Sequence, residues 1–219
     1  MDAIKKKKLI YSLWSLVYLA LTIVIVVSSV SLFNNFYYES VYVNGSSMSP
    51  TFDGRGESER FGSDYGIIDK DYGAKKNVKR FQIVTTYYPG DQKEVASYKI
   101  KRLYVKPGET FKFENNDLYI KRGDSWGEPL VMPFTRNGVD NVDTPQIIRN
   151  TEPMTLKDNE YFVVGDNWVG SLDSFSVGPI SFDLLVGVVV KMEGKCTVQN
   201  GKVTEKQKTE DRYYLGVDY

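Results

Sequence analysis

The stretch SYKIKRLYVKPGETFKFENNDLYIK, residues 97–121, contains a strand, a turn and a hairpin in succession. Its first part alternates polar with aromatic and aliphatic side chains, which is typical of a β-strand. Pro107-Gly108 ends that strand, because a Pro-Gly pair favours a turn. The remainder predicts a hairpin that turns at Asn115-Asn116. Since strands joined by tight turns pair in opposite directions, this stretch predicts an antiparallel sheet.

Further strand-like segments lie on both sides of this stretch. ESVYVNG, residues 39–45, places Val41 and Val43 on one face. The others are RFQIVTTYYPGD, EYFVVGDN and LLVGVVVKME, followed by a small hairpin, CTVQNGKVTEK. Outside the N-terminal segment no convincing amphipathic helix is found. The fold class predicted is therefore mainly β, with antiparallel pairing.

Three segments lack strand periodicity. Residues 53–80 are rich in Gly, Asp, Lys and Arg and predict a long irregular loop with at most a short strand at 65–69. Residues 121–158 hold four of the eight prolines and predict a small loop-rich insertion. The last dozen residues are polar and aromatic, and we expect them to be loosely held.

The N-terminal segment predicts a membrane anchor. LIYSLWSLVYLALTIVIVVSSVSLF, residues 9–33, is uncharged and long enough to span a bilayer, and KKKK precedes it. The positive-inside rule places residues 1–8 in the cytoplasm and residues 34–219 outside it, so we expect a single-pass type II protein of the cell membrane. A cleavable signal is the alternative, with small residues at Ser28, Ser29 and Ser31, but its apolar core is usually shorter.

Composition limits the chemistry. Basic and acidic residues both number 28, so no overall field favours nucleic acid. The chain has one cysteine, Cys196, and no histidine, which excludes an internal disulfide and a zinc site of Cys and His ligands. Nothing in the sequence implies a metal or an organic cofactor, and we expect none.

VNGSSMSPTF, residues 43–52, raises the question of a serine nucleophile. A serine hydroxyl needs a base, and in the absence of histidine a lysine is one possible partner. The base must be neutral, which requires burial to lower its pKa. Lys99 and Lys101 lie on one face of the strand at 97–105 and are candidates. The alternative, which composition alone favours, is an edge strand with solvated lysines.

Three ordered motifs resemble those of bacterial type I signal peptidases, in their Gram-positive form. VNGSSMSPT resembles the family's serine motif, KRLYVKPGE its lysine motif, and VVGDNWVGSLDSFSVGPI its third motif. Together with the preceding anchor they extend over most of the chain. The resemblance implies a signal peptidase type of β-fold and a serine endopeptidase with a Ser–Lys dyad.

The resemblance also implies roles for particular residues. Ser47, directly before Met, would be the nucleophile, and Lys101, directly before Arg, the general base. Gly45 precedes the nucleophile by two residues, so backbone N–H groups at and around Ser47 would form the oxyanion hole. Ser171 would orient the base. The residues that would support the site are Met48, Pro50, Arg102, Asp166, Asn167 and Asp173.

Some positions depart from the family pattern. Trp168 and Phe175 stand where the family has arginines, and Glu109 replaces an aspartate. The second arginine pairs in the family with the aspartate at the position of Asp173. Asp173 lacks that partner, so either Arg102 or another cation takes its place or the site is looser.

The resemblance implies exported preproteins as substrates, cleaved after small residues, and the lipid bilayer as a partner. Nucleic acid is not expected, and the sequence assigns no oligomeric state. Two other hypotheses remain at this stage. One is a catalytically impaired or specialised homologue that assists surface-protein or pilus assembly. The other is a self-cleaving repressor-type Ser–Lys protease, which the anchor and the third motif disfavour.

Overall fold

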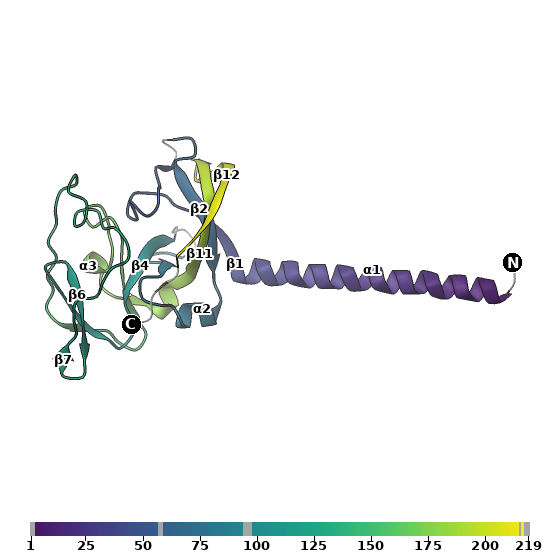
Figure 1. Cartoon of the computed structure of the whole chain (residues 1–219), viewed down its shortest axis with the longest axis horizontal. Helices are drawn as coiled ribbons and strands as arrows, with labels where there is room; N and C mark the ends of the chain where they lie inside the picture. Colours follow the sequence, from purple (N-terminus) through teal and green to yellow (C-terminus); the bar gives the residue numbers. More distant parts are fainter. Residues whose placement is uncertain (1–2, 57–58, 94–97, 215, 217–219) are drawn as a thin grey trace. The chain divides into compact units, whose positions relative to one another are not determined.

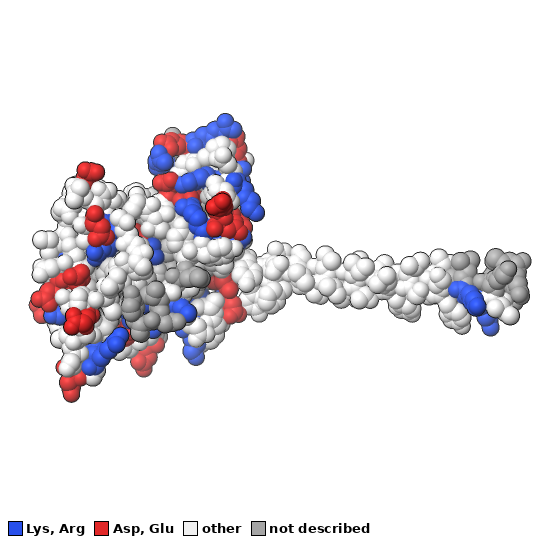
Figure 2. Space-filling model, viewed as in Figure 1, with Lys and Arg blue, Asp and Glu red and all other residues white. Residues whose placement is uncertain are grey.

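The computed structural model describes residues 3–56, 59–93, 98–214 and 216. The chain forms two units, residues 1–38 and 39–219. The first consists of helix α1, Ala3–Tyr37. Its segment Ile10–Tyr37 is long and apolar enough to cross a membrane by length and composition. Uncharged surface covers this part of the helix, and lysines lie near its start (Figure 2). The helix extends four residues past Phe33, the predicted end of the anchor.

The second unit is built on an eight-stranded sheet (Figure 1). Its strand order is β1-β2-β11-β3-β4-β9-β10, and β12 pairs with β11. The pairings from β2 to β10 and that of β12 are antiparallel, as the sequence predicts. The strands are β1 (Tyr38–Tyr42), β2 (Ser63–Asp69), β3 (Ile83–Thr86), β4 (Lys99–Val105), β9 (Glu160–Val164), β10 (Ile180–Ser181), β11 (Leu185–Gln199) and β12 (Lys202–Tyr213).

A smaller sheet carries the order β7-β6-β5-β8. Its strands are β5 (Thr110–Glu114), β6 (Asp117–Arg122), β7 (Ser125–Trp126) and β8 (Met154–Thr155). The predicted hairpin turn is confirmed, because Asn115 and Asn116 connect β5 to β6 with φ of 50° and 74°. Asparagine tolerates this left-handed region better than most residues. Between β7 and β8 the chain is irregular, in agreement with the predicted insertion.

The position of β4 decides the environment of its lysines. The strand lies between β3 and β9 and pairs with both. The edge-strand interpretation is therefore wrong. An interior strand presents both faces to other parts of the protein, and six of the seven residues of β4 are buried.

The large sheet is curved. Strand β11 shows register shifts against β2, β3 and β12, and such bulges bend a strand and increase its twist. The curvature brings β1 opposite β4, although three strands separate them in the sheet order. The two strands line a common groove of ≈ 430 Å³.

Two predictions about irregular segments need correction. The last dozen residues are not all loosely held, because β12 continues to Tyr213 and pairs with β11. Most of its side chains are polar and exposed, so main-chain hydrogen bonds define the strand and no apolar face marks it in the sequence. The loop at 53–80 contains β2, which begins two residues earlier than predicted, and a short helix α2, Tyr72–Lys76, capped by Asp71.

Candidate active site

The first motif forms a tight turn directly after β1. The Ser49 N–H donates to the Ser46 carbonyl at 3.0 Å, and the Phe52 N–H donates to the Met48 carbonyl at 3.0 Å. Met48 and Phe52 are 1% and 0% exposed and anchor the turn in the core. Ser47 directly precedes Met48 and is half-buried. The turn therefore fixes the Ser47 backbone while the hydroxyl stays accessible.

Lys101 reaches this hydroxyl from β4. Its Nζ lies 2.7 Å from Ser47 Oγ and donates to the Ile100 carbonyl at 2.9 Å. The side chain is 4% exposed. Burial lowers the pKa of Lys101 from 10.5 to about 8, opposed by the nearby carboxylate of Asp173 and assisted by the charge of Lys99. A substantial fraction of the amine is therefore neutral near pH 8, as a general base requires.

The third motif packs directly against the first. The Asn167 N–H donates to the Ser47 carbonyl at 3.0 Å, and its Nδ2 donates to the Ser46 carbonyl at 3.0 Å. Gly165 permits this approach, because a Cβ there would lie 2.4 Å from the Ser47 carbonyl oxygen and 2.2 Å from Ser171 Oγ. Asn167 therefore holds the backbone of Ser47, and the missing side chain of Gly165 leaves room for this contact.

Arg102 and Asp166 form a buried ion pair beside the dyad. Arg102 Nε donates to Asp166 Oδ1 at 2.8 Å, and Nη2 donates to Oδ2 at 2.5 Å. Thr51 donates its hydroxyl to the same carboxylate at 2.5 Å, and Arg102 Nη1 donates to the Phe81 carbonyl at 2.8 Å. The network joins the first motif, through Thr51, to the lysine and third motifs. Pro50, next to Thr51, is exposed and makes the cis peptide bond with Ser49.

Asp173 is not paired with Arg102, so that expectation is wrong. Its side chain is 0% exposed and accepts from the Gly165 N–H at 3.1 Å and the Phe175 N–H at 3.2 Å. It caps helix α3, Ser174–Val177. No cation within the described residues forms an ion pair with Asp173. Its charge instead acts on the Lys101 amine, whose pKa it raises.

Ser171 lies next to the dyad but is not hydrogen-bonded to Lys101. Its Oγ is buried and has no hydrogen-bond partner within the part of the chain that the structure describes. The hydroxyl lies close to Gly165, which itself contacts the Ser47 carbonyl. The orienting bond that the sequence predicts for Ser171 is thus absent from this geometry.

Trp168 and Phe175 form an aromatic cluster with arginines from the insertion. Their ring centroids are 5.6 Å apart, and Trp168 is 1% exposed. Arg149 Cζ lies 4.3 Å from the Phe175 ring centroid, and its Nη2 donates to the Trp168 carbonyl at 3.2 Å. Arg136 Cζ lies 5.3 Å from the Trp168 ring. Sequence reasoning missed both arginines, because nothing in the aperiodic segment 121–158 distinguishes them from solvated charges.

A groove between β1 and β4 leads to the dyad. Ser47 and Lys101 lie in it, and Met48 forms part of its wall. Tyr98 donates its hydroxyl to Glu39 at 3.0 Å and packs edge-on against Tyr87, with centroids 5.4 Å apart. The other lining residues are Ser40, Val41, Tyr42, Val43, Asn44, Thr85, Lys99 and Ile100. Among the described residues no group of three Cys, Asp or Glu side chains is arranged to hold a metal ion.

The chain matches known proteins over most of its length. The family model described as "Signal peptidase, peptidase S26" matches residues 15–192. Signal peptidase I V of Bacillus subtilis (strain 168) is 32% identical over 160 residues, 69% of this chain and 83% of the relative. A signal peptidase I of Bacillus amyloliquefaciens is 29% identical over 188 residues, 84% of this chain and 86% of the relative. A crystal structure of a signal peptidase I from Enterococcus faecalis V583 matches 50% of this chain and 94% of its own, at 25% identity and a TM-score of 0.38. The family model covers well over half of the sequence, so the chain belongs to the signal peptidase family, peptidase S26.

Proposed function

We propose that this membrane-anchored serine endopeptidase removes N-terminal signal peptides from exported preproteins, with Ser47 as nucleophile and Lys101 as general base. The observation that carries the assignment of the dyad is the 2.7 Å separation of Lys101 Nζ and Ser47 Oγ at the end of a groove. Family membership supports the reaction class, and the relatives named signal peptidase I support preproteins as substrates.

The geometry supports a direct sequence of steps. A substrate strand lies extended in the groove between β1 and β4, where it pairs by main-chain hydrogen bonds. Neutral Lys101 accepts the proton of Ser47 Oγ as this oxygen attacks the scissile carbonyl. Lys101 then protonates the leaving amine, and water hydrolyses the ester that remains on Ser47. No metal or organic cofactor takes part in this proposal.

The oxyanion is stabilised by backbone N–H groups. Gly45 has no side chain to contribute, and a Cβ placed there would have no neighbour within 4 Å. The Ser47 N–H donates to no acceptor among the described residues, so it is available to the developing negative charge.

The anchor is proposed to have type II topology. Residues 1–8 are cytoplasmic, residues 9–33 cross the bilayer and residues 34–219 lie outside the cytoplasm. The four lysines before the span support this orientation. Protease added outside intact protoplasts should digest the C-terminal region, and protection of that region would contradict the orientation.

The second hypothesis, an impaired homologue that assists surface-protein or pilus assembly, is not favoured. The dyad is assembled at hydrogen-bonding distance, and the aromatic residues that replace two arginines of the family are packed with Arg149 and Arg136. These departures are therefore accommodated without disturbing Ser47 or Lys101.

The function is tested with the purified full chain and a preprotein. Wild type should release a mature product whose new N-terminus follows a small residue, and Ser47→Ala should reduce cleavage to background. Ser46→Ala is the matched control and should retain most activity, because the Ser46 hydroxyl makes no hydrogen bond within the described residues. An active Ser47→Ala variant would exclude Ser47 as the nucleophile.

The pH dependence of cleavage should report Lys101. We expect kcat/KM to rise through a midpoint near pH 8, because the base acts only when neutral and burial lowers its pKa to about 8. The native pKa lies below the unfolded value of 10.5, so the contribution of Lys101 to stability should also increase as the pH rises from about 8 to 10.5. Peptide cleavage followed from about pH 6 to about pH 10 checks the first effect. If kcat/KM were still rising with pH near pH 10, the result would indicate a solvated lysine.

A further inference from the structure

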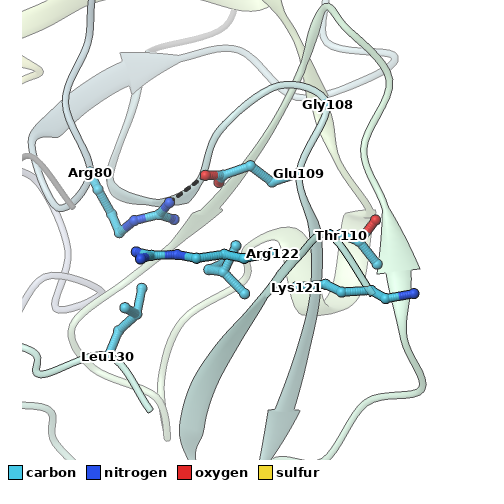
Figure 3. A pocket seen from close by; sticks show the side chains of 9 residues that line it. Arg80, Gly108, Glu109, Thr110, Lys121, Arg122 and Leu130 are labelled. Carbon is cyan, nitrogen blue, oxygen red and sulfur yellow. Dashed lines mark hydrogen bonds and ion pairs between the residues drawn. The ribbon is translucent and has the colours of Figure 1, made fainter. Parts of the chain in front are cut away.

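A second cavity, of ≈ 380 Å³, lies at the end of the smaller sheet and shares no residue with the groove of the dyad. It is lined by the loop before β3, the turn before β5 and the end of β6 (Figure 3). Three basic side chains, Arg80, Lys121 and Arg122, line it together with one acidic side chain, Glu109. The cavity is therefore electropositive in a chain whose formal net charge is zero.

Arg80 supplies a buried positive charge. Its side chain is 2% exposed, its Nη1 donates to the Tyr104 carbonyl and its Nη2 to Glu109, both at 2.5 Å. The Glu109 carboxylate also accepts a hydrogen bond from the Lys106 N–H at 2.7 Å. The Nε of Arg80 is buried and has no acceptor among the described residues. Arg80 is thus rigidly held, and its donors are only partly satisfied.

Arg122 faces Arg80 without a carboxylate partner. It follows Ile120 by two residues in β6, but its side chain, unlike that of Ile120, is exposed at the mouth of the cavity. Figure 3 shows its side chain extending across the cavity toward Arg80, whereas the neighbouring Lys121 points away. Within the described residues Arg122 has no ion pair. Two guanidinium groups that face each other repel, and Glu109, bonded to Arg80, is the single carboxylate among the lining residues, so an anion between the arginines would be favoured.

We propose that this cavity binds a phosphate group, carried by a small molecule or by a lipid head group. Guanidinium groups match phosphate geometry through paired N–H donors. Arg80 and Arg122 approach from different elements, and the tetrahedral oxygens of phosphate accept from two directions, whereas a planar carboxylate occupies one guanidinium. The volume exceeds what phosphate alone requires and leaves room for a small ester substituent.

The test uses the full chain in nanodiscs of zwitterionic lipid, titrated calorimetrically with inorganic phosphate and with glycerol phosphate at constant ionic strength. Wild type should bind with saturation at one site. Arg122→Gln should weaken binding at least about tenfold, since a charge-assisted hydrogen bond is lost. Lys121→Gln removes the same charge one residue away and should change the affinity by less than about threefold. Arg122→Lys, which keeps the charge but not the paired donors, should be intermediate.

Nanodiscs that contain phosphatidylglycerol distinguish the two sources of phosphate. Loss of soluble phosphate binding in these discs would identify a lipid head group, and unchanged binding would identify a free phosphate ester. A thermal melt of Arg122→Gln without ligand verifies that the variant is folded. Absence of saturable binding to wild type, equal affinity of Arg122→Gln and wild type, or acetate bound as tightly as phosphate would each overturn the proposal.

Discussion

Lys101→Met should lower the rate of preprotein cleavage by at least about 10⁴-fold, comparable to the loss of one member of other serine protease triads. Methionine has a similar length and suits the buried site, but it cannot accept the Ser47 proton. No histidine exists to replace it, and the lysine Nζ is the side-chain nitrogen bonded to Ser47 Oγ. The measurement is kcat/KM on one peptide substrate, with circular dichroism to verify the fold.

Lys99→Met is the matched control, because Lys99 lies on the same face of β4 and lines the same groove. This variant should retain most activity. It should also shift the rise of kcat/KM with pH to higher pH, since the charge of Lys99 helps to lower the pKa of Lys101. Loss of activity in Lys99→Met together with an active Lys101→Met would assign the base to the other lysine.

Arg102→Met should destabilise the chain by about 3–5 kcal/mol, the usual cost of removing one partner of a buried ion pair. The substitution leaves the Asp166 carboxylate 0% exposed, with the Thr51 hydroxyl as its remaining side-chain partner. The free energy of unfolding of the full chain in detergent, measured by denaturant titration, tests this. Lower activity should accompany it, because the pair joins β4, next to Lys101, to the third motif.

Arg60→Met is the control for the ion pair. Arg60 pairs with Glu205 at 2.9 Å, but the two side chains are 73% and 46% exposed. Arg60→Met should therefore lower the free energy of unfolding by less than about 1 kcal/mol. A cost for Arg102→Met no larger than that of Arg60→Met would show that the buried pair contributes little to stability.

Local patterns predicted the strands well, because alternation and Pro-Gly or Asn-Asn turns act over a few residues. The burial of Lys101 could not be predicted from such local patterns. It depends on β3 and β9 pairing on either side of β4, and β9 lies some sixty residues further along the chain. The three motifs identified the dyad by resemblance, whereas composition alone favoured solvated lysines.

The remaining wrong or missing predictions concern side-chain interaction partners that are determined by the tertiary structure. Arg102 was expected near Asp173, yet its side chain pairs with Asp166, which lies two residues past Val164, the partner of Arg102 in the sheet. Backbone N–H groups satisfy Asp173, and main-chain donors leave no signature in a sequence. Arg149 contacts Trp168 and Phe175 across an irregular segment, where no periodicity indicates which arginine faces inward.

The place of β11 in the sheet has a consequence for biosynthesis. This strand pairs with β2 along residues 188–196 and with β3 along residues 185–188, so among the described strands its pairing links the part of the sheet that holds β1 and β2 to the part that carries Lys101. A chain still being made cannot form these pairings in full until residue 196 has emerged. We therefore expect cleavage activity to begin only after β11 has been made and has paired with both of its neighbours.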